Sequence, residues 1–570
     1  MTASLNNAQV NLQYIKELAY DDFKKALSGN TTCNHDKKSL VFEQDLIPYI
    51  ELSISQTQLK GWNVVSFHYL DNINPSTNYV VFIIRKNPKS WQNTINYITK
   101  NTQSHYKIIV ISNDKYTIGM NMLERANLRT KIPICTLPIT LIPIDNDLLS
   151  MEYLNAFKEN RIEHNTDYLF DAAESIILLQ QLYGIIPVIQ GIGEQAQIVA
   201  KEVIDGKKLI LHTDSSIARM IIIDRACDYI TPLLTQITFT GALDEQIGIE
   251  SNKVRINGKI IKVNSDDQAY VLIRDKRLDD IIDLLKPEMS KYTNYYKMAK
   301  ESKLKGDIKE LNEAISSIKE LNKVYKETSL TNLYNLLQML IIPNDIIDIE
   351  QQLLLGQIKD DAFMKMWLEL LKKKMEVMVL IKCICLYCII SDGITVDLCK
   401  QFERYIIQYY GTNYVFVFDN LFTAGILFPK GYDGRWKKLH STFNLIADDY
   451  QDISYTYNGY APLSCRLVEY ALSVKLDKFR VQKKKDVMYK GWVDKDINNK
   501  VNLVDDPFYV VQETNLIKDN VVLVYFIGGI TYAEIAALRY ISKMNKDKHI
   551  LIATTCIING NKMVQSFLKR

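Results

Sequence analysis

Short apolar runs rich in β-branched residues alternate with helical stretches in the amino-terminal quarter of the chain. Three such runs lie at Val64–Phe67, Tyr79–Ile84 and Lys107–Ile111, and Pro143 interrupts a fourth at Ile139–Ile144. The apolar spacing over Gln44–Lys60 predicts helix. Strands separated by helices favour a parallel sheet with helices on its faces.

The same alternation returns later in the chain, but in two separated places. Asp171–Tyr183 has the 3–4 spacing of a helix with one buried face, and Met220–Ile223 is a strand-like apolar run. Near the carboxyl end, Val521–Ile527 and His549–Thr554 are apolar strands flanking a helical Tyr532–Lys543. Two strands cannot form a stable sheet alone. We therefore expect Met220–Ile223 to pair with them, in one α/β domain split by an inserted region.

The inserted region is predicted to be mainly helical. Asn257-Gly258 within Val254–Val263 predicts a two-residue β-hairpin, and Asp279–Tyr410 has helical spacing almost throughout. One stretch forms a three-heptad apolar seam with one Asn, of the type buried in coiled coils. Its positions are Leu304, Ile308, Leu311, Ile315, Ile318, Asn322 and Tyr325. The seam indicates either an ordinary antiparallel hairpin packed on its own domain or a helix that presents apolar positions to a partner helix.

Composition restricts the class of protein without choosing a function. A chain of 570 residues predicts two to four domains, and 69 Lys+Arg against 66 Asp+Glu give no overall attraction to nucleic acid. Nine scattered Cys favour reduced thiols in the cytosol, and the polar amino end favours no secretory signal. The apolar run Val377–Ile390, interrupted by Lys382, is shorter than the ~20 residues needed to span a bilayer. Arg480–Asn520 is mostly polar and predicts a loop or linker.

Motifs for nucleotide or metal chemistry are weak. The chain lacks a GxxxxGK[ST] phosphate loop, and Gly191-x-Gly193 lacks the third glycine of a dinucleotide site. Gly528-Gly529 favours a tight turn over an anion site. Cys383, Cys385 and Cys388 lie in an apolar helical stretch with no His nearby, which favours burial over metal binding. We expect no catalytic residue, metal or cofactor, and a nucleotide-binding or enzymatic α/β protein with a non-standard site is the alternative.

Charged residues at strand and helix ends have two interpretations. Asp224 and Arg225 follow the run at Met220–Ile223, where an α/β enzyme could place catalytic groups. We favour structural ion pairs that lock the sheet to the inserted region, with Arg539 in a similar role. Lys483–Lys485 could contact anionic lipid, but such a run is more often simply solvated.

Several separated blocks carry a family resemblance. Met220–Glu245, MIIIDRACDYITPLLTQITFTGALDE, resembles the central signature of the SM family, the cytosolic chaperones of SNARE assembly. Asp452–Val468, DISYTYNGYAPLSCRLV, resembles the vacuolar-protein-sorting branch found in the HOPS and CORVET tethering complexes. Further similar blocks are Asp145–Glu152, Gly528–Tyr540 and Ala553–Gly560, with weaker support from Glu350–Gly356 and Asn420–Leu427.

The resemblance implies a three-domain arch of two parallel-sheet α/β domains and a large, mainly helical inserted domain. The expected domains are 1–145, a discontinuous 146–242 with 480–570, and a helical 243–479. SNARE motifs, syntaxin-like and R-type, would bind between the first and third domains and along a helical hairpin near Met289–Ile342.

The resemblance also implies a partner complex and a location. A helical domain of the class C tethering subunit number sixteen would dock near Tyr455, Tyr457 and Tyr460, which are expected to be exposed or, equally, packed in the core. Through HOPS or CORVET the chain would associate peripherally with endosomal and lysosomal or vacuolar membranes. It would catalyse no covalent reaction but hold SNARE helices in register.

Overall fold

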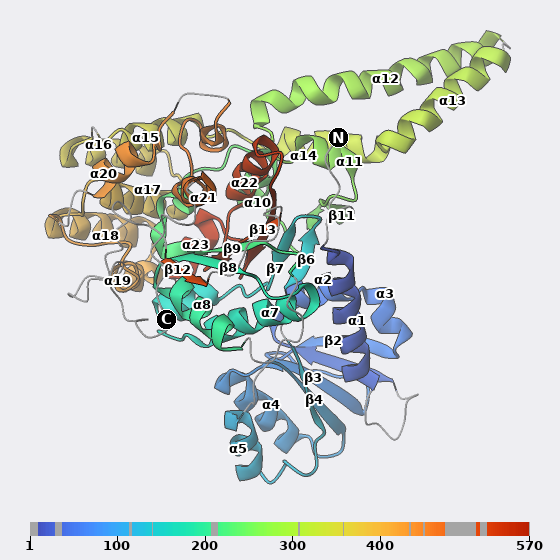
Figure 1. The fold of residues 1–570 in the computed structure, drawn as a ribbon, viewed down its shortest axis with the longest axis vertical. Coiled ribbons are helices and arrows are strands. Elements are labelled where there is room, and N and C mark those ends of the chain that lie inside the picture. The colour runs from blue at the N-terminus through green and yellow to red at the C-terminus, as the bar shows by residue number, and fades with distance from the viewer. Residues whose placement is uncertain are drawn as a thin grey trace.

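The structure is a computed structural model that combines two α/β units with a large helical part and a long projecting hairpin (Figure 1). The residues that it describes are 10–28, 37–112, 117–138, 141–206, 215–305, 308–356, 358–431, 435–447, 451–473, 509–512 and 521–568. Lys483–Lys485 and most of the predicted Arg480–Asn520 loop lie outside these residues.

The first unit is a five-stranded sheet, entirely parallel, with the order β2-β1-β3-β4-β5. Its strands are β1 (Lys38–Phe42), β2 (Val64–Tyr69), β3 (Tyr79–Arg85), β4 (His105–Ile111) and β5 (Ile134–Leu137). Its helices are α1 (Leu12–Ser28), α2 (Ile47–Ser53), α3 (Gln56–Gly61), α4 (Pro88–Lys100) and α5 (Thr117–Arg125). The three predicted strands are confirmed. The predicted Gln44–Lys60 helix is divided between α2 and α3, because Ser55 begins α3 with a capping box.

The second unit is a seven-stranded sheet with the order β12-β8-β9-β13-β14-β7-β6. Its strands are β6 (Ile142–Asp145), β7 (Leu148–Ser150), β8 (Val188–Ile192), β9 (Arg219–Asp224), β12 (Tyr509–Gln512), β13 (Val521–Ile527) and β14 (His549–Thr554). Its helices are α6 (Ala156–Arg161), α7 (Asp167–Tyr183), α8 (Glu194–Gly206), α22 (Tyr532–Met544) and α23 (Gly560–Gln565).

Strand pairing joins segments far apart in the sequence. β13 pairs in parallel with β9 on one side and with β14 on the other, so the predicted split sheet is confirmed. Two sequence predictions are wrong: β6, from the expected fourth strand of the first unit, belongs to the second sheet, and β12 is a strand within the expected loop. Both are edge strands antiparallel to their neighbours, and their short polar-flanked runs carry a weak strand signal. The domain boundaries themselves stay predictions.

The inserted region is mainly helical, as expected. β9 is followed by α9 (Ile230–Leu233) and α10 (Phe239–Gln246), and then by the hairpin of β10 (Lys253–Ile256) and β11 (Lys259–Lys262). Asn257 and Gly258 both have positive φ, 48° and 76°, which confirms the predicted turn. The remaining helices are α11 (Gln268–Ile273), α12 (Leu278–Lys305), α13 (Ile308–Val324), α14 (Glu327–Met339), α15 (Asn344–Leu354), α16 (Asp360–Lys372), α17 (Val377–Ile390), α18 (Val396–Tyr410), α19 (Val415–Thr423), α20 (Arg435–Thr442) and α21 (Leu463–Ser473).

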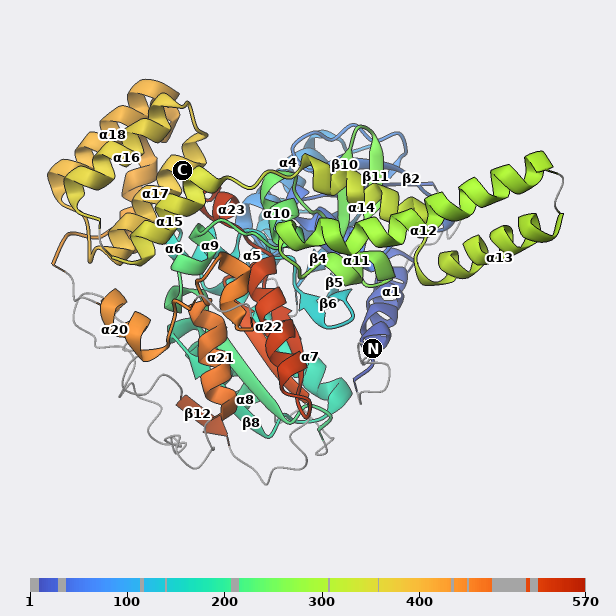
Figure 2. The ribbon, with the colours of Figure 1, turned by 90° about the horizontal axis from the view of Figure 1, so that it is seen from above.

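The core is continuous between the second sheet and the helical part. α17 lies at its centre, and its side chains are buried on nearly every face. A separate apolar cluster formed by α10, α11, α12 and α14 anchors the base of the projecting hairpin. The hairpin therefore rests on its own small core, and its far half extends beyond it (Figure 2).

Candidate functional site

The projecting hairpin consists of α12 and α13, which run antiparallel away from the body of the molecule (Figures 1 and 2). Ala314, 1% exposed, lies on the inner face of α13 against α12. The Tyr292 hydroxyl donates to the backbone oxygen of Tyr325 and lies 3.2 Å from the side-chain oxygen of Asn322. These contacts near the base hold the two helices together.

The predicted seam is divided between the two helices and between two faces. The seam does not lie on a single helix, because α12 ends at Lys305 and α13 begins at Ile308. The intervening Gly306-Asp307 are residue types that disfavour helix interiors. The half-buried seam residues are Leu311 and Ile318 on α13 and Tyr325 directly after it, and the exposed ones are Leu304 on α12 and Ile308 and Ile315 on α13.

Asn322 is not buried as the heptad pattern predicts, although its side-chain oxygen lies 3.2 Å from the Tyr292 hydroxyl of α12. Its side chain is exposed, and its oxygen accepts from the backbone N–H of Glu327 at 3.2 Å. It thus serves the connection into α14. The heptad pattern could not show this, because the most buried residue of α13 is Ala314, which is not one of the seam positions.

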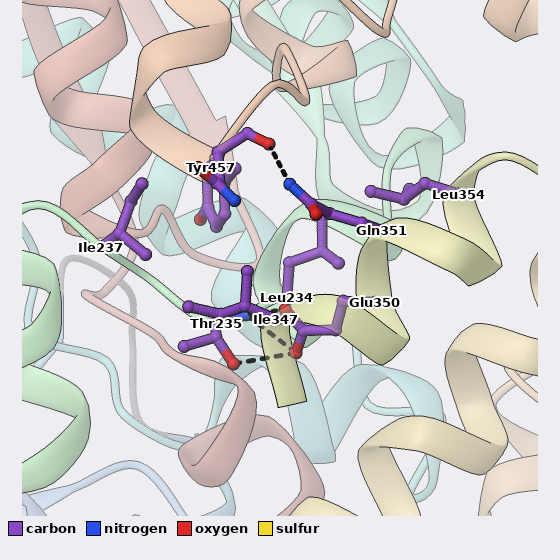
Figure 3. Close-up of a pocket in the computed structure, with 9 residues that line it drawn as sticks. Leu234, Thr235, Ile237, Ile347, Glu350, Gln351, Leu354 and Tyr457 are labelled. Atoms are coloured by element: carbon purple, nitrogen blue, oxygen red, sulfur yellow. Dashed lines mark hydrogen bonds between the residues drawn. The ribbon is translucent and has the colours of Figure 1, made fainter. Parts of the chain in front are cut away.

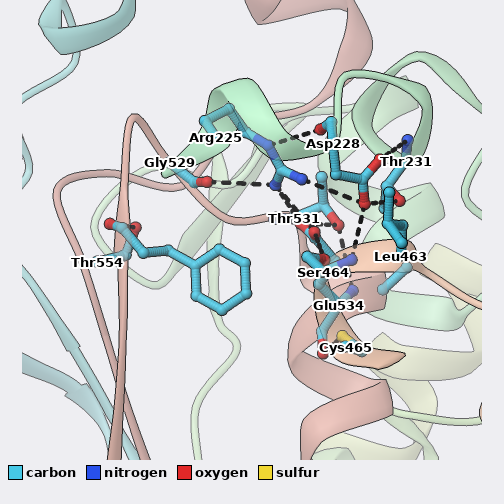
Figure 4. A network of polar contacts seen from close by, with 12 residues as sticks. Arg225, Asp228, Thr231, Leu463, Ser464, Cys465, Gly529, Thr531, Glu534 and Thr554 are labelled. Atoms are coloured by element: carbon cyan, nitrogen blue, oxygen red, sulfur yellow. Dashed lines mark hydrogen bonds and ion pairs between the residues drawn. The ribbon is translucent and has the colours of Figure 1, made fainter. Parts of the chain in front are cut away.

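A buried polar network lies where β9 ends (Figure 4). Arg225, 1% exposed, donates from Nη1 to both carboxylate oxygens of Glu534 on α22, each at 2.9 Å, and from Nε to the backbone oxygen of Asp228 at 2.9 Å. Ser464 of α21 donates to both carboxylates, by its hydroxyl to Glu534 and by its backbone N–H to Asp228. Burial opposes the charge on Arg225, but Glu534 and Asp228 raise its pKa above the ordinary value. The network joins the split sheet to the helical part.

The tyrosines proposed for the tether contact lie against this network. Tyr457 and Tyr460 are 4% and 1% exposed, so of the two alternatives left open by the sequence, both side chains are packed in the core. Their hydroxyls lie within hydrogen-bond distance of Thr531 and Thr231, at 3.0 and 3.3 Å. Tyr455 is half-buried and donates to the backbone oxygen of Asp275. Their burial depends on partners distant in sequence, so the local pattern could not reveal it.

Arg539 lies at the centre of a second ion-pair cluster. It contacts Asp147 through two nitrogens at 2.8 Å, Asp145 at 2.9 Å and Asp275 at 3.0 Å, while Arg274 contacts Asp145 at 2.6 Å. Burial disfavours charge on Asp147, but the Arg539 guanidinium lowers the pKa of that carboxyl below its ordinary value. The cluster connects the β6–β7 turn, the segment after α11 and α22. Sequence reasoning missed its acidic members, because their common partner Arg539 lies far from them in the sequence.

At Gly191-x-Gly193, the candidate dinucleotide motif, a side chain of the protein itself occupies the place where a phosphate would bind. Asp224 accepts from the backbone N–H of Gln195, in the first turn of α8, at 3.1 Å and also contacts Arg161 at 3.5 Å. Gly193 has φ +95°, and a Cβ there would lie 2.4 Å from Cβ of Asp224. The carboxylate thus occupies the helix N-terminus at which a phosphate would bind. This glycine is needed for close packing against Asp224.

A small pocket lies between α15 and the segment before α10 (Figure 3). Its volume is about 10 Å³, which is room for roughly one water molecule. The Glu350 carboxylate accepts from the backbone N–H and hydroxyl of Thr235, and burial raises its pKa to about 7 despite the opposing effect of Lys382. Lys382 forms an ion pair with Glu245. The groups around this pocket make structural contacts with one another. In the sequence, the lysine within the apolar Val377–Ile390 run was the feature that indicated a buried charge here.

The remaining candidate chemistry lies inside helices. Cys383, Cys385 and Cys388 are buried in α17, and burial raises the pKa of Cys383 and of Cys388 to about 12. Among the residues that the structure describes, no three His, Cys, Asp or Glu side chains are grouped to hold a metal. Within the same residues, no helix is long and apolar enough to cross a membrane.

Comparison with known proteins decides the family. The sequence model of the Sec1 family matches residues 38–566. The chain belongs to the Sec1 family. Vacuolar protein sorting-associated protein 33A of Rattus norvegicus is 25% identical over 621 aligned positions, covering 100% of both chains. The vacuolar protein-sorting-associated protein 33 homolog of Arabidopsis thaliana is 24% identical and covers 100% of this chain and 99% of its own. The resemblance to the SM family and its vacuolar-sorting branch is thus confirmed.

Solved structures share the fold of this Sec1-family chain. The Unc18–syntaxin 1 complex from Monosiga brevicollis matches with a TM-score of 0.58 and 14% identity, covering 98% of this chain and 100% of that one. The SM protein Vps45 in complex with the Qa SNARE Tlg2 matches with a TM-score of 0.54 and 17% identity, covering 97% of each. The predicted fold class, parallel-sheet α/β domains with a large helical part, is confirmed.

Proposed function

We propose that the chain binds SNARE helices and templates their assembly during vesicle fusion, without covalent catalysis. Its membership of the Sec1 family supports this, as do the similar structures whose titles describe complexes with syntaxin 1 and with the Qa SNARE Tlg2. Two helices held side by side in register combine in a step that is nearly unimolecular, which lowers the entropic barrier. That role needs a long, accessible surface and no nucleophile or cofactor.

The α12–α13 hairpin supplies such a surface, and its exposed outer face is the observation that supports the proposal most strongly. Ile315 is 40% exposed on α13, one turn beyond the half-buried Leu311, and Ile308 lies two turns before it at 72% exposure. Apolar side chains at this spacing on one helix match the anchors of helix-in-groove recognition. The inner seam residues, such as Ile318, would act by holding the hairpin together.

The relatives that are named for vacuolar protein sorting support a finer assignment. The chain would serve as the SM subunit of HOPS or CORVET, docked on the class C subunit number sixteen, at endosomal and lysosomal or vacuolar membranes. The docking surface would lie near the second domain and the late helical part. Of the three tyrosines, only Tyr455 is exposed enough to contribute directly, while Tyr457 and Tyr460 would shape the surface from beneath.

One pair of substitutions on α13 tests SNARE binding. Ile315→Asp places a charge on the outer face, and Ser316→Asp adds the same charge at an exposed neighbour. If Ile315 is an anchor, the first change weakens binding of a purified syntaxin-like SNARE motif about thirtyfold or more, as for an interface hot spot. The measurement is calorimetric titration of both variants beside the unsubstituted chain, with melting curves to verify folding.

The matched control makes the result decisive. Ser316→Asp should bind as the unsubstituted chain does, and both variants should melt at the same temperature. Equal affinity of all three proteins would refute the hairpin as the binding surface. Ile318→Asp is unsuitable for this test, because its half-buried side chain packs in the cluster at the hairpin base.

A further inference from the structure

The distal part of α12 is strongly basic. Lys297, Lys300, Lys303 and Lys305 are all exposed, and Glu301 is the single acidic residue over the stretch 297–305. Four positive charges against one give a local charge of +3 in a chain whose total is also +3. No described carboxylate lies within ion-pairing distance of these four lysines. Within the described residues, the positive charge of this segment is therefore not offset by an ion pair.

The neighbouring start of α13, with Asp307 before it, lowers this positive charge to a net +1 over residues 297–313. It contributes one further lysine and two glutamates, Glu310 and Glu313. The Glu310 carboxylate already accepts from the Ser302 hydroxyl at 3.0 Å, across the two helices. The basic character thus belongs to α12 and extends to the point where that helix ends.

Two large apolar side chains lie at the same outermost point. Leu304, 79% exposed, is the penultimate residue of α12, and Ile308, 72% exposed, is the first residue of α13. Both views show this end of the hairpin as the part farthest from the body (Figures 1 and 2). Tyr296 and Met298 are 46% and 44% exposed on the basic part of α12. Lysines surrounding exposed apolar residues are typical of peripheral membrane-binding surfaces.

We infer that the hairpin tip, defined as residues 297–305 with Ile308, binds the surface of an anionic lipid bilayer. The lysines would approach the headgroup phosphates, and Leu304 and Ile308 would enter the headgroup boundary. Each lysine near such a surface increases membrane partitioning about fivefold. A 28-residue α12 is about 42 Å long, so the tip reaches a surface well away from the sheets. A SNARE-binding face centred on Ile315 lies about 10 Å nearer the body.

The charge pattern favours a bilayer over a protein partner. Helical partners are recognised by apolar residues at regular spacing along one face. At the tip the lysines lie on several sides of α12, and the most exposed apolar residues lie at its very end. This suits a broad anionic plane approached end-on. The inference goes beyond the proposed function and does not depend on SNARE binding.

Vesicle flotation of the full chain tests it. The two probes are vesicles of phosphatidylcholine alone and of phosphatidylcholine with about 30% phosphatidylserine. The test variant carries Lys→Glu at all four tip lysines. The matched control carries the same four charge changes at exposed lysines elsewhere, namely Lys372, Lys400, Lys437 and Lys438.

The expected result is binding to anionic vesicles only, reduced by raising the salt concentration. The tip variant should lose about a hundredfold or more in affinity, while the control should lose only severalfold. A Leu304→Ser, Ile308→Ser variant should lose about tenfold with its charge unchanged. All these side chains are exposed, so melting temperatures should equal that of the unsubstituted chain.

Several outcomes would overturn the inference. These are no binding of the unsubstituted chain to anionic vesicles, equal binding to neutral ones, or equal losses in the tip and control variants. If the tip variant loses only the binding of SNARE motifs, the basic tip contacts a protein and the bilayer assignment is wrong. Because vesicles without protein are the probe, failure here leaves the SNARE-binding proposal standing.

Discussion

Replacing Arg225 by Met removes the only positive charge of the network that joins β9, α21 and α22 among the described residues. Glu534 is fully buried, and Asp228 is 1% exposed. Arg225→Met leaves both carboxylates without the guanidinium that compensates their charge. Breaking a buried ion pair by removing one partner costs about 3–5 kcal/mol. A folding unit of about 150–250 residues melts about 2–4 °C lower for each kcal/mol of lost stability, so the melting temperature should fall by about 6–20 °C.

The assay is thermal unfolding by circular dichroism, with a matched surface control. Arg129→Met removes an arginine whose ion pair with Glu124 is exposed, and it should cost less than about 1 kcal/mol. Adding Glu534→Gln to Arg225→Met should restore part of the loss, because a buried charge disappears. If Arg225→Met melts within the range of the Arg129→Met control, the network does not stabilise the fold as argued.

Three further predictions concern buried groups elsewhere. Burial raises the pKa of Glu350 from 4.5 to about 7, so the folded chain binds this proton more tightly than the unfolded chain does. The unsubstituted chain should therefore lose about 3 kcal/mol of stability, relative to Glu350→Gln, as the pH rises from 4.5 to 7. Parallel melting profiles of the two proteins across that range would contradict this. Gly193→Ala should be more destabilising than Gly248→Ala in denaturant titrations, because both glycines have φ +95° but only Gly193 meets Asp224; equal losses would refute steric packing as the reason for this glycine. Arg539→Met, which leaves three aspartates close together, should lower stability by about 3 kcal/mol or more and increase proteolysis at the domain junction, and an unchanged digestion pattern would count against that role.

The central strands of the second sheet could be predicted, because their own residue types indicate that both faces are buried. Val521–Ile527 and His549–Thr554 are uniformly apolar, as parallel strands covered on both faces must be. Their partnership with β9 followed from the fact that two strands need further pairing. β1 was missed because Lys38 and Ser39 begin it, yet both are buried, and the Lys38 ammonium donates to the backbone oxygen of Leu27.

The candidate site was less predictable, because its geometry depends on pairings across the chain. The apolar residues of the hairpin were visible, but their division into inner and outer faces depends on where α12 ends and on how α13 packs. On sequence alone Tyr457 and Tyr460 could equally be interface or core residues, and the partners that bury them, Thr531 and Thr231, are distant in the sequence. Ion-pair partners such as Glu534 and Arg225 are 309 residues apart, so neither segment alone identifies the other.

The most direct test of the central claim is the rate of SNARE assembly in the presence of the purified chain. Fluorescence energy transfer between a labelled syntaxin-like motif and a labelled R-type motif would report zippering without membranes. We predict that the unsubstituted chain and Ser316→Asp accelerate assembly, while Ile315→Asp does not. Assembly at the same rate with and without the unsubstituted chain would contradict templating, and equal acceleration by Ile315→Asp would contradict the hairpin as its site.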